Sequence, residues 1–147
     1  AIENAALNQV ENIRFIAGDM RLVLPQLIEQ VDNPDVVVLD PPRAGLSAKT
    51  VRRVLEARAR RIVYVSCNPT TLAPNLQQMC EVGYELKRVR PVDMFPHTPH
   101  IEVVAQLDLV DEAKLHNFIE NRKLEKLAAI EEARAKKAKR DAKKEAR

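Results

Sequence analysis

Two short apolar runs constrain the fold of this chain most, because each ends in polar residues that are followed by proline. The run at residues 36–39 leads into Asp40-Pro41-Pro42, and the run at residues 62–65 leads into Ser66-Cys67-Asn68-Pro69. Continuous apolar runs of this length indicate buried strands, and proline turns the chain away from a strand. In open α/β sheets, ligands bind at the edge formed by the carboxyl ends of the strands. The two runs therefore predict neighbouring strands that bring a carboxylate and a thiol to one site.

Strand and helix signals alternate through residues 1–110. The pattern predicts the last turns of a helix over 1–8, strands over 12–17, 35–39 and 61–66, and helices over 21–31, 47–59 and 70–82. Two consecutive strands, 84–92 and 101–109, follow. Ser47 is a suitable N-cap, and Pro25 is compatible with a helix only in its first turn. This order predicts an α/β fold with a mostly parallel sheet and a terminal antiparallel hairpin.

The opening of such a sheet is missing from this sequence. A sheet of this kind normally begins with a strand and a glycine-rich loop that carries a nucleotide or cofactor. The chain has only three glycines, Gly18, Gly45 and Gly83, and they are isolated from one another. We therefore expect residues 1–110 to be the C-terminal portion of a larger domain.

Residues 111–147 differ in composition from the rest of the chain. They hold 12 of the 24 Lys and Arg residues but 8 of the 21 Asp and Glu residues, which gives this segment a net charge of +4 and leaves −1 for residues 1–110. Strong helix formers fill the segment, and its large apolar residues stop at Ile130. We expect a charged, largely helical C-terminal extension whose first half docks and whose basic end is solvated. Purely electrostatic attraction to nucleic acid would lie mainly there.

The composition also limits the cellular compartments in which the protein is expected. No apolar stretch approaches the ~20 residues of a membrane span, and the first residues show no secretory signal. The two cysteines, Cys67 and Cys80, form no CxxC motif. These features predict a cytoplasmic protein with free thiols.

Several residues could carry chemistry, and each has two readings. Cys67 is either a small buried side chain or a nucleophile, and its place at the polar end of a strand favours the nucleophile. Asp40 is either a turn residue before the two prolines or a carboxylate that lines the same crevice as Cys67. Arg43 contacts either a phosphate or a surface carboxylate. Glu102 begins an otherwise apolar strand, where it lies on the solvent face or acts as a partly desolvated base. His97 and His100 are spaced HxxH, but without a third ligand they do not predict a metal site.

Three motifs in order resemble one known family. They are Asp40-Pro41-Pro42-Arg43-x-Gly45, Ser66-Cys67-Asn68-Pro69 and Phe95-Pro96-His97-Thr98-x-His100-x-Glu102. Together they resemble the S-adenosylmethionine-dependent RNA uracil-C5 methyltransferases, which make 5-methyluridine in tRNA and bacterial ribosomal RNA. The stretches Asn4-Ala5-x-x-Asn8 and Phe15-x-x-Gly18-Asp19 are also similar to that family. The resemblance covers residues 1–110.

The resemblance implies a Rossmann-like methyltransferase sheet and specific residue roles. Cys67 would add to C6 of uracil, which activates C5 toward the methyl group, and Glu102 would remove the C5 proton. Asp19 and Asp40 would line the S-adenosylmethionine site. Residues on the substrate side would be Arg43, Asn68 and Pro69. The RNA partner would have to expose its uridine by turning it out of the stack.

Some features of the family are not in this sequence. Its glycine-rich loop, the acidic residue that holds the cofactor ribose and any RNA-binding domain would all precede residue 1. The chain also lacks the four-cysteine motif of an iron–sulfur domain. Two alternatives stay open: a methyltransferase of exocyclic amines, whose motif resembles Asp40-Pro41-Pro42, and a non-catalytic RNA-binding fragment. The presence of Arg43 instead of an aromatic residue argues against the first. A covalent adduct between Cys67 and 5-fluorouridine RNA would exclude both.

Overall fold

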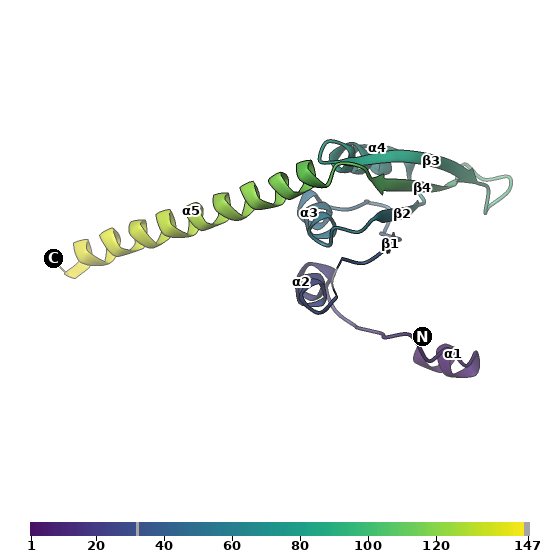
Figure 1. Ribbon diagram of the computed structural model, residues 1–147, viewed down its shortest axis with the longest axis horizontal. Coiled ribbons are helices and arrows are strands. Elements are labelled where there is room, and N and C mark those ends of the chain that lie inside the picture. The colour runs from purple at the N-terminus through teal and green to yellow at the C-terminus, as the bar shows by residue number, and fades with distance from the viewer. Residues whose placement is uncertain (32, 146–147) are drawn as a thin grey trace.

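A computed structural model describes residues 1–31 and 33–145 (Figure 1). Within these residues the helices and strands are, in order, α1 (Ile2–Leu7), α2 (Met20–Gln30), β1 (Val36–Leu39), α3 (Ala48–Glu56), β2 (Arg61–Ser66), α4 (Pro69–Cys80), β3 (Tyr84–Val92), β4 (Glu102–Leu109) and α5 (Glu112–Glu145).

The four strands form one sheet in the order β1-β2-β4-β3. Strands β1 and β2 are parallel, whereas β4 is antiparallel to both of its neighbours, β2 and β3. The α/β fold class and the terminal hairpin are confirmed. The expected mostly parallel sheet is not seen in the described part of the chain, where β1–β2 is the one parallel pair and the pairs β2–β4 and β3–β4 are antiparallel. Because β4 lies between β2 and β3, the strand that ends next to Cys67 has the Asp40 strand on one side and the Glu102 strand on the other.

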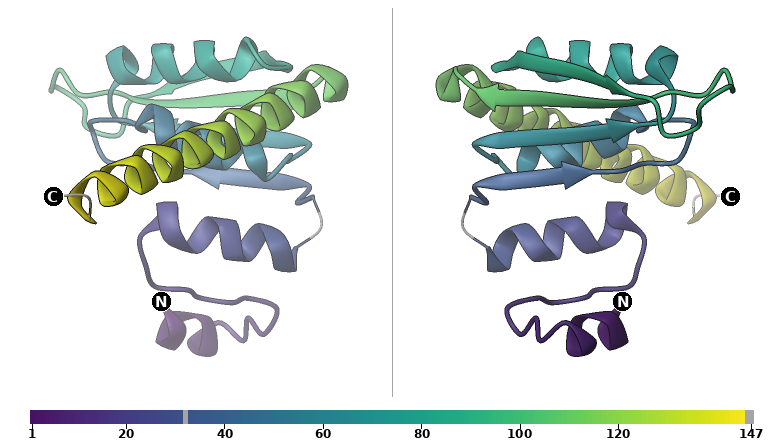
Figure 2. Two further views of the ribbon diagram at one scale, coloured as in Figure 1. Left: turned by 90° about the vertical axis from the view of Figure 1, so that its left-hand side faces the viewer. Right: turned by 90° about the vertical axis from the view of Figure 1, so that its right-hand side faces the viewer.

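Helices α3, α4 and the start of α5 cover one face of the sheet, while the strands lie open on the other face (Figure 2). The buried core lies on the covered face. Its largest fully buried side chains are Tyr64, Leu55, Ile62, Met79, Leu107, Leu115, Val51 and Val54. On the open face, Val36 is 49% exposed and Val38 is 67% exposed. Strand β1 is therefore apolar on both faces, but the described residues cover only one of them.

The local sequence signals explain where two of the helices begin. The side chain of Ser47 accepts a hydrogen bond from the backbone N–H of Thr50, 3.2 Å away, and so caps α3 as expected. Asn68 caps α4 in the same way, with Thr70 as donor, and Pro69 occupies the first helical position. Proline is well suited to that position because its missing N–H would have no partner there.

Two expectations about residues 12–30 are wrong. Residues 12–17 form no strand, and Ile13 and Phe15 are 49% and 42% exposed. A strand needs a neighbour for its backbone hydrogen bonds, and this segment lies beside none of the four strands. Helix α2 also continues through Pro25, beyond its first turn. Contacts with α3 stabilise α2 there, although proline removes one backbone hydrogen bond.

Helix α5 docks over a shorter length than expected. Leu115 and Ile119 are buried in the core, but Leu124, Leu127 and Ile130 are 63%, 58% and 49% exposed. The helix then projects away from the sheet (Figure 1). Among the residues that the structure describes, no helix is both long enough and apolar enough to cross a membrane.

Candidate active site

A crevice beside the carboxyl end of β1 brings together two of the predicted cofactor residues. Asp19, which precedes α2, and Asp40, which follows β1, both line a hollow of about 470 Å³. Val38, Pro41 and Pro42 supply apolar wall. Binding sites for small molecules have volumes of about 300–1,000 Å³ and combine apolar walls with a few polar groups. The crevice thus has the size and chemistry of a small-molecule site.

The buried side chain of Asn75 on α4 holds one wall of this crevice. Its oxygen accepts a hydrogen bond from the backbone N–H of Leu46, 2.9 Å away, and its nitrogen donates to the carbonyl of Leu46 over 3.0 Å. The same oxygen accepts from the phenol of Tyr64 on β2, and burial raises the pKa of that phenol. Gly45 has φ +71°, and a Cβ there would lie 3.1 Å from the Asn75 oxygen. The turn at Gly45 therefore requires glycine both for its backbone angle and for its space.

Asn75 is a positioning residue that the sequence analysis did not identify. It lies three residues after Leu72 and four before Met79, both of which are buried in the core. A polar residue on the apolar face of a helix must find a partner, because burying an unpaired polar group is costly. That spacing was the signal in the sequence that could have revealed it.

The predicted nucleophile and the predicted base come to facing positions at one end of the β2–β4 pair. Ser66 and Val103 are partners in the antiparallel register. Cys67 comes directly after Ser66, and Glu102 comes directly before Val103. Both side chains are half-buried, and Cys67 forms no disulfide. Since Val103 is buried, the alternation of side chains places Glu102 on the open face of the sheet.

Hydrogen bonds join the loop that follows β1 to the start of α4 and its N-cap, directly after β2. The side-chain amide of Asn68 donates to the carbonyl of Arg43 over 3.3 Å, and the hydroxyl of Thr71 donates to the same carbonyl over 3.1 Å. Arg43 and Pro69 themselves are exposed. The predicted substrate residues Arg43, Asn68 and Pro69 are thus gathered beside Cys67.

The loop between β3 and β4 lies at the same end of the sheet, because it leads directly into Glu102. Met94 and Phe95 are 60% and 54% exposed, and His97 has φ +67°, a left-handed angle that is uncommon outside glycine. No group of three His, Cys, Asp or Glu residues that could hold a metal ion occurs within the described ranges. The loop is an exposed rim beside the Cys67–Glu102 position.

The predicted residues therefore form two neighbouring groups. Asp19 and Asp40 line the crevice, whereas neither Cys67 nor Glu102 is among the residues that line it. The Asn68–Arg43 hydrogen bond connects the two groups. A thiol and a carboxylate at facing positions can provide a nucleophile and a base, and the crevice alongside can hold a second reactant.

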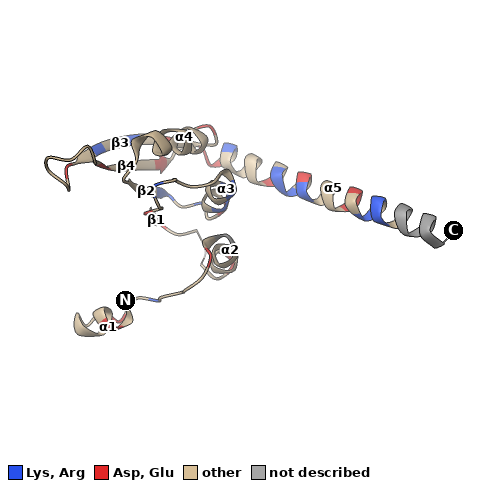
Figure 3. Cartoon of the chain, turned by 180° about the vertical axis from the view of Figure 1, so that it is seen from behind, with Lys and Arg blue, Asp and Glu red and all other residues tan. Residues whose placement is uncertain are grey.

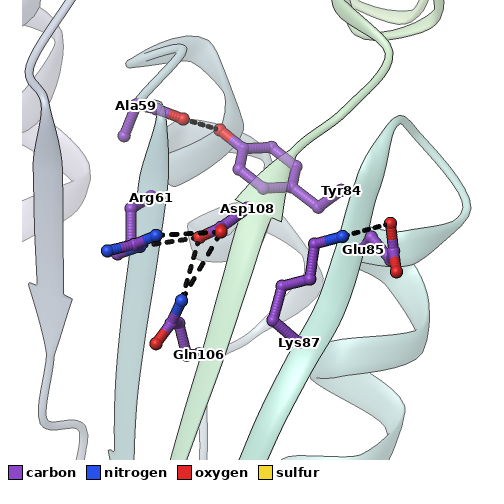
Figure 4. Close-up of polar contacts among 7 residues, drawn as sticks. All are labelled: Ala59, Arg61, Tyr84, Glu85, Lys87, Gln106 and Asp108. Atoms are coloured by element: carbon purple, nitrogen blue, oxygen red, sulfur yellow. Dashed lines mark hydrogen bonds and ion pairs between the residues drawn. The ribbon is translucent and has the colours of Figure 1, made fainter.

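The opposite end of the strands carries contacts that fix the register of the sheet (Figure 4). The guanidinium of Arg61 donates two hydrogen bonds to the carboxylate of Asp108, at 2.7 and 2.9 Å, and this contact lowers the pKa of Asp108. The phenol of Tyr84 donates to the carbonyl of Ala59 over 2.7 Å, and burial raises its pKa to about 12. These contacts hold β2, β4 and β3 in the alignment that sets Cys67 opposite Glu102.

Comparison with known proteins now assigns the chain to a family. The model of the tRNA (uracil-5-)-methyltransferase family matches residues 1–110. The chain belongs to this family. An RNA methyltransferase of Enterococcus faecalis whose function is uncharacterised is 51% identical over 107 residues, which are 73% of this chain and 23% of that protein. A similar protein of Bacteroides thetaiotaomicron is 50% identical over 107 residues, 72% of this chain and 23% of that protein.

Solved structures agree with the family and the fold. The tRNA (uracil-54, C5)-methyltransferase of Pyrococcus abyssi, solved in complex with S-adenosyl-L-homocysteine, is 39% identical with a TM-score of 0.60. The match covers 72% of this chain and 24% of that one. An rRNA methylase of Streptococcus thermophilus has a TM-score of 0.53 at 9% identity, over 75% of this chain and 65% of that one, which supports the fold alone. The family member therefore has a Rossmann-like methyltransferase fold, and it spans about a quarter of the length of its curated relatives.

Proposed function

We propose that this chain forms the C-terminal part of an enzyme that transfers a methyl group from S-adenosylmethionine to C5 of a uridine in tRNA or ribosomal RNA. The observation that carries the proposal is the facing position of Cys67 and Glu102 at the end of the β2–β4 pair. Nucleophilic activation of a pyrimidine needs a thiol and a base that reach the same ring. Cys67 directly follows β2 and Glu102 begins the neighbouring strand β4, so the two residues lie close enough in the register to share one ring.

The reaction follows from the poor nucleophilicity of C5 in uracil. The thiolate of Cys67 adds to C6, and the electron pair of the C5–C6 double bond moves into the ring as an enolate. C5 then takes the methyl group, whose bond to the sulfonium of the cofactor breaks, and S-adenosylhomocysteine is released. Glu102 removes the proton from C5, the bond between C6 and the sulfur of Cys67 breaks, and the double bond and the free thiol return.

The crevice between Asp19 and Asp40 is the proposed cofactor site. Its volume of about 470 Å³ and its apolar walls suit a nucleoside, and its two carboxylates can accept hydrogen bonds from the amino and hydroxyl groups of S-adenosylmethionine. The P. abyssi relative was solved with S-adenosylhomocysteine, which is the demethylated form of this cofactor. The remaining walls would come from the part of the longer protein that these 147 residues do not include.

Arg43, Asn68 and Pro69 form the proposed substrate side of the site. Arg43 is exposed beside the Cys67 loop, where its guanidinium can contact an RNA phosphate. A uridine can reach Cys67 only after it has left its stack, because C6 is enclosed between neighbouring bases in a helix.

A covalent trap tests this function in the longer enzyme. With RNA that contains 5-fluorouridine, fluorine replaces the proton that Glu102 removes, so the adduct should persist after methyl transfer. We expect a cofactor-dependent protein–RNA band on a denaturing gel, lost with Cys67→Ala and kept with Cys80→Ala. Methylation of RNA without any adduct would contradict the mechanism, and transfer to an exocyclic amine would contradict the substrate atom.

A further inference from the structure

Helices α3 and α5 enclose a second, smaller hollow on the helical face of the molecule. It has a volume of about 120 Å³ and is lined by Lys49, Arg52, Arg53, Glu56, Phe118, Ile119, Arg122 and Lys126. We call these eight residues the α3–α5 groove. Figure 3 shows Lys and Arg residues on both helices. Five of the eight side chains are cations and one is an anion, although residues 1–110 as a whole are slightly acidic.

Ion pairs within the chain account for only part of this positive charge. Glu56 pairs with Arg53 at 2.6 Å and lies 3.8 Å from Lys126, and Arg122 pairs with Glu125 at 2.7 Å. Among the described residues, Lys49 and Arg52 have no ion-pair partner. Glu81 shares an adjoining hollow with Arg52 but forms its hydrogen bond with Gln77. Two cations of the α3–α5 groove are therefore available to an external anion.

The size of the groove restricts what that anion can be. A drug-sized ligand needs about 300–1,000 Å³, which is more than the 120 Å³ here. The groove can instead take one small anionic group that belongs to a larger molecule lying across the surface. Its apolar floor, Phe118 and Ile119, is packed against the core, so the groove offers no exposed apolar side chains to insert into a membrane.

The position of the groove favours a nucleic acid as its occupant. Thr50 lines the proposed cofactor crevice, and Lys49, its neighbour on α3, lines the groove. Beyond the groove, α5 continues away from the sheet with further exposed cations at Arg134 and Lys137, while Lys136 pairs with Glu132 at 2.5 Å. Cations spread over such a length match a polymer with one charge per repeat better than a folded acidic domain.

We propose that the α3–α5 groove binds the phosphate backbone of the RNA substrate, away from the reactive uridine. The proposal rests on the proposed function for the identity of the RNA as substrate. Lys49 and Arg52 each contact a phosphate, and Arg122 and Lys126 from α5 complete the positive surface. The groove thus anchors the RNA by charge, without reading its sequence.

Titration of the 147-residue chain with a single-stranded RNA, at several salt concentrations, tests the anchor. The plot of log affinity against log salt falls with a slope of about −0.7 for each phosphate contact to single-stranded nucleic acid. Lys49→Gln with Arg52→Gln should therefore make this slope less steep by about 1.4, and it should weaken the affinity roughly 25-fold at 0.1 M salt. The matched control, Arg88→Gln with Lys114→Gln, removes two exposed cations outside the groove and should leave both values unchanged. Lys49→Arg with Arg52→Lys keeps the charge and should retain binding.

Three outcomes would overturn the anchor: equal weakening by the groove and control variants, competition by polyglutamate as strong as by RNA, or no RNA binding by the unmodified chain. The proposed function is judged separately. In the longer enzyme, Lys49→Gln with Arg52→Gln should raise KM for RNA without lowering kcat, and the 5-fluorouridine adduct should still form. If the adduct forms with unchanged KM, the anchor fails while the methyltransferase proposal stands.

Discussion

The phenol of Tyr64 donates a hydrogen bond to the side-chain oxygen of Asn75, 2.9 Å away, in the buried space between β2 and α4. The same oxygen also accepts from the backbone of Leu46. One amide side chain therefore joins three parts of the site: the strand that leads to Cys67, the helix that follows it, and the loop that forms a wall of the crevice. These hydrogen bonds fix the position of the loop relative to β2 and α4.

Replacing Asn75 with Leu should destabilise the protein. The change leaves the N–H and the carbonyl of Leu46 and the phenol of Tyr64 without their partner. An unsatisfied buried polar group costs about 1–3 kcal/mol, so we expect roughly 2–4 kcal/mol less stability in urea unfolding. Gln77→Leu, on the exposed side of the same helix, is the control and should change stability little. Equal effects of the two variants would show that Asn75 does not hold the loop.

We expect the folded protein to lose stability at high pH because Tyr84 is buried in its neutral form. Its pKa is raised from 10 to about 12 in the folded chain, because the phenol is buried. Below pH 10 both the folded and unfolded states keep the proton, so this contribution is complete. Between about pH 10 and 12 the unfolded state loses its proton first, and stability falls.

Urea unfolding across that range, with Tyr84→Phe for comparison, measures the effect. The variant lacks the ionisable group and should lose less stability between pH 10 and 12, the range set by the two pKa values. At neutral pH it should be less stable, because the carbonyl of Ala59 loses its donor. Identical pH profiles for the two proteins would show that Tyr84 ionises freely in the folded state.

Cys67→Ala should abolish methyl transfer in the longer enzyme while cofactor binding is retained. The thiol is the proposed nucleophile, and no other described side chain at this end of β2 can replace it. Cys80→Ala is the matched control: Cys80 ends α4 and packs partly against the core, so activity should persist. Transfer of tritiated methyl groups by Cys67→Ala above a tenth of the unmodified rate would reject the assignment.

Much of this site was predictable because it rests on local signals. The two apolar runs identified β1 and β2, and the prolines placed Asp40 and Cys67 at their ends. Ser47 marked the start of α3, and the helix predicted from residue 70 begins within one residue of the observed start of α4 at Pro69. Each of these features depends on a few neighbouring residues, so the sequence alone contained the information.

The features that the sequence did not reveal depend on distant partners. The facing of Cys67 and Glu102 required β4 to insert between β2 and β3, which no local pattern specifies. The absence of a strand at residues 12–17 likewise reflects a missing neighbour, since the apolar pattern itself suits a strand. Leu124 and Leu127 are exposed for a similar reason. Their helical spacing predicts that they share one face of α5, but it does not show whether another part of the protein packs against that face.

The 147-residue chain by itself should not bind S-adenosylmethionine with micromolar affinity. Asp19 and Asp40 line the crevice, but the chain has no glycine-rich loop to hold the cofactor. Calorimetric titration of the purified chain with the cofactor is the measurement. Micromolar binding would mean that residues 1–110 hold a complete cofactor site and that the crevice assignment is wrong.

Glu102→Gln should separate methyl transfer from product release in the longer enzyme. The variant retains Cys67, so the thiol can still add to C6 and C5 can still take the methyl group. Glutamine cannot accept the C5 proton, so elimination should stall and the adduct should accumulate with ordinary uridine RNA. A denaturing gel should show a protein–RNA band that carries a tritiated methyl group. Glu85→Gln, an exposed carboxylate of β3 at the opposite end of the sheet, makes the same chemical change outside the site and should release its product normally. If Glu102→Gln instead releases free methylated RNA at the normal rate, Glu102 is not the base, and its position opposite Cys67 has only a structural role.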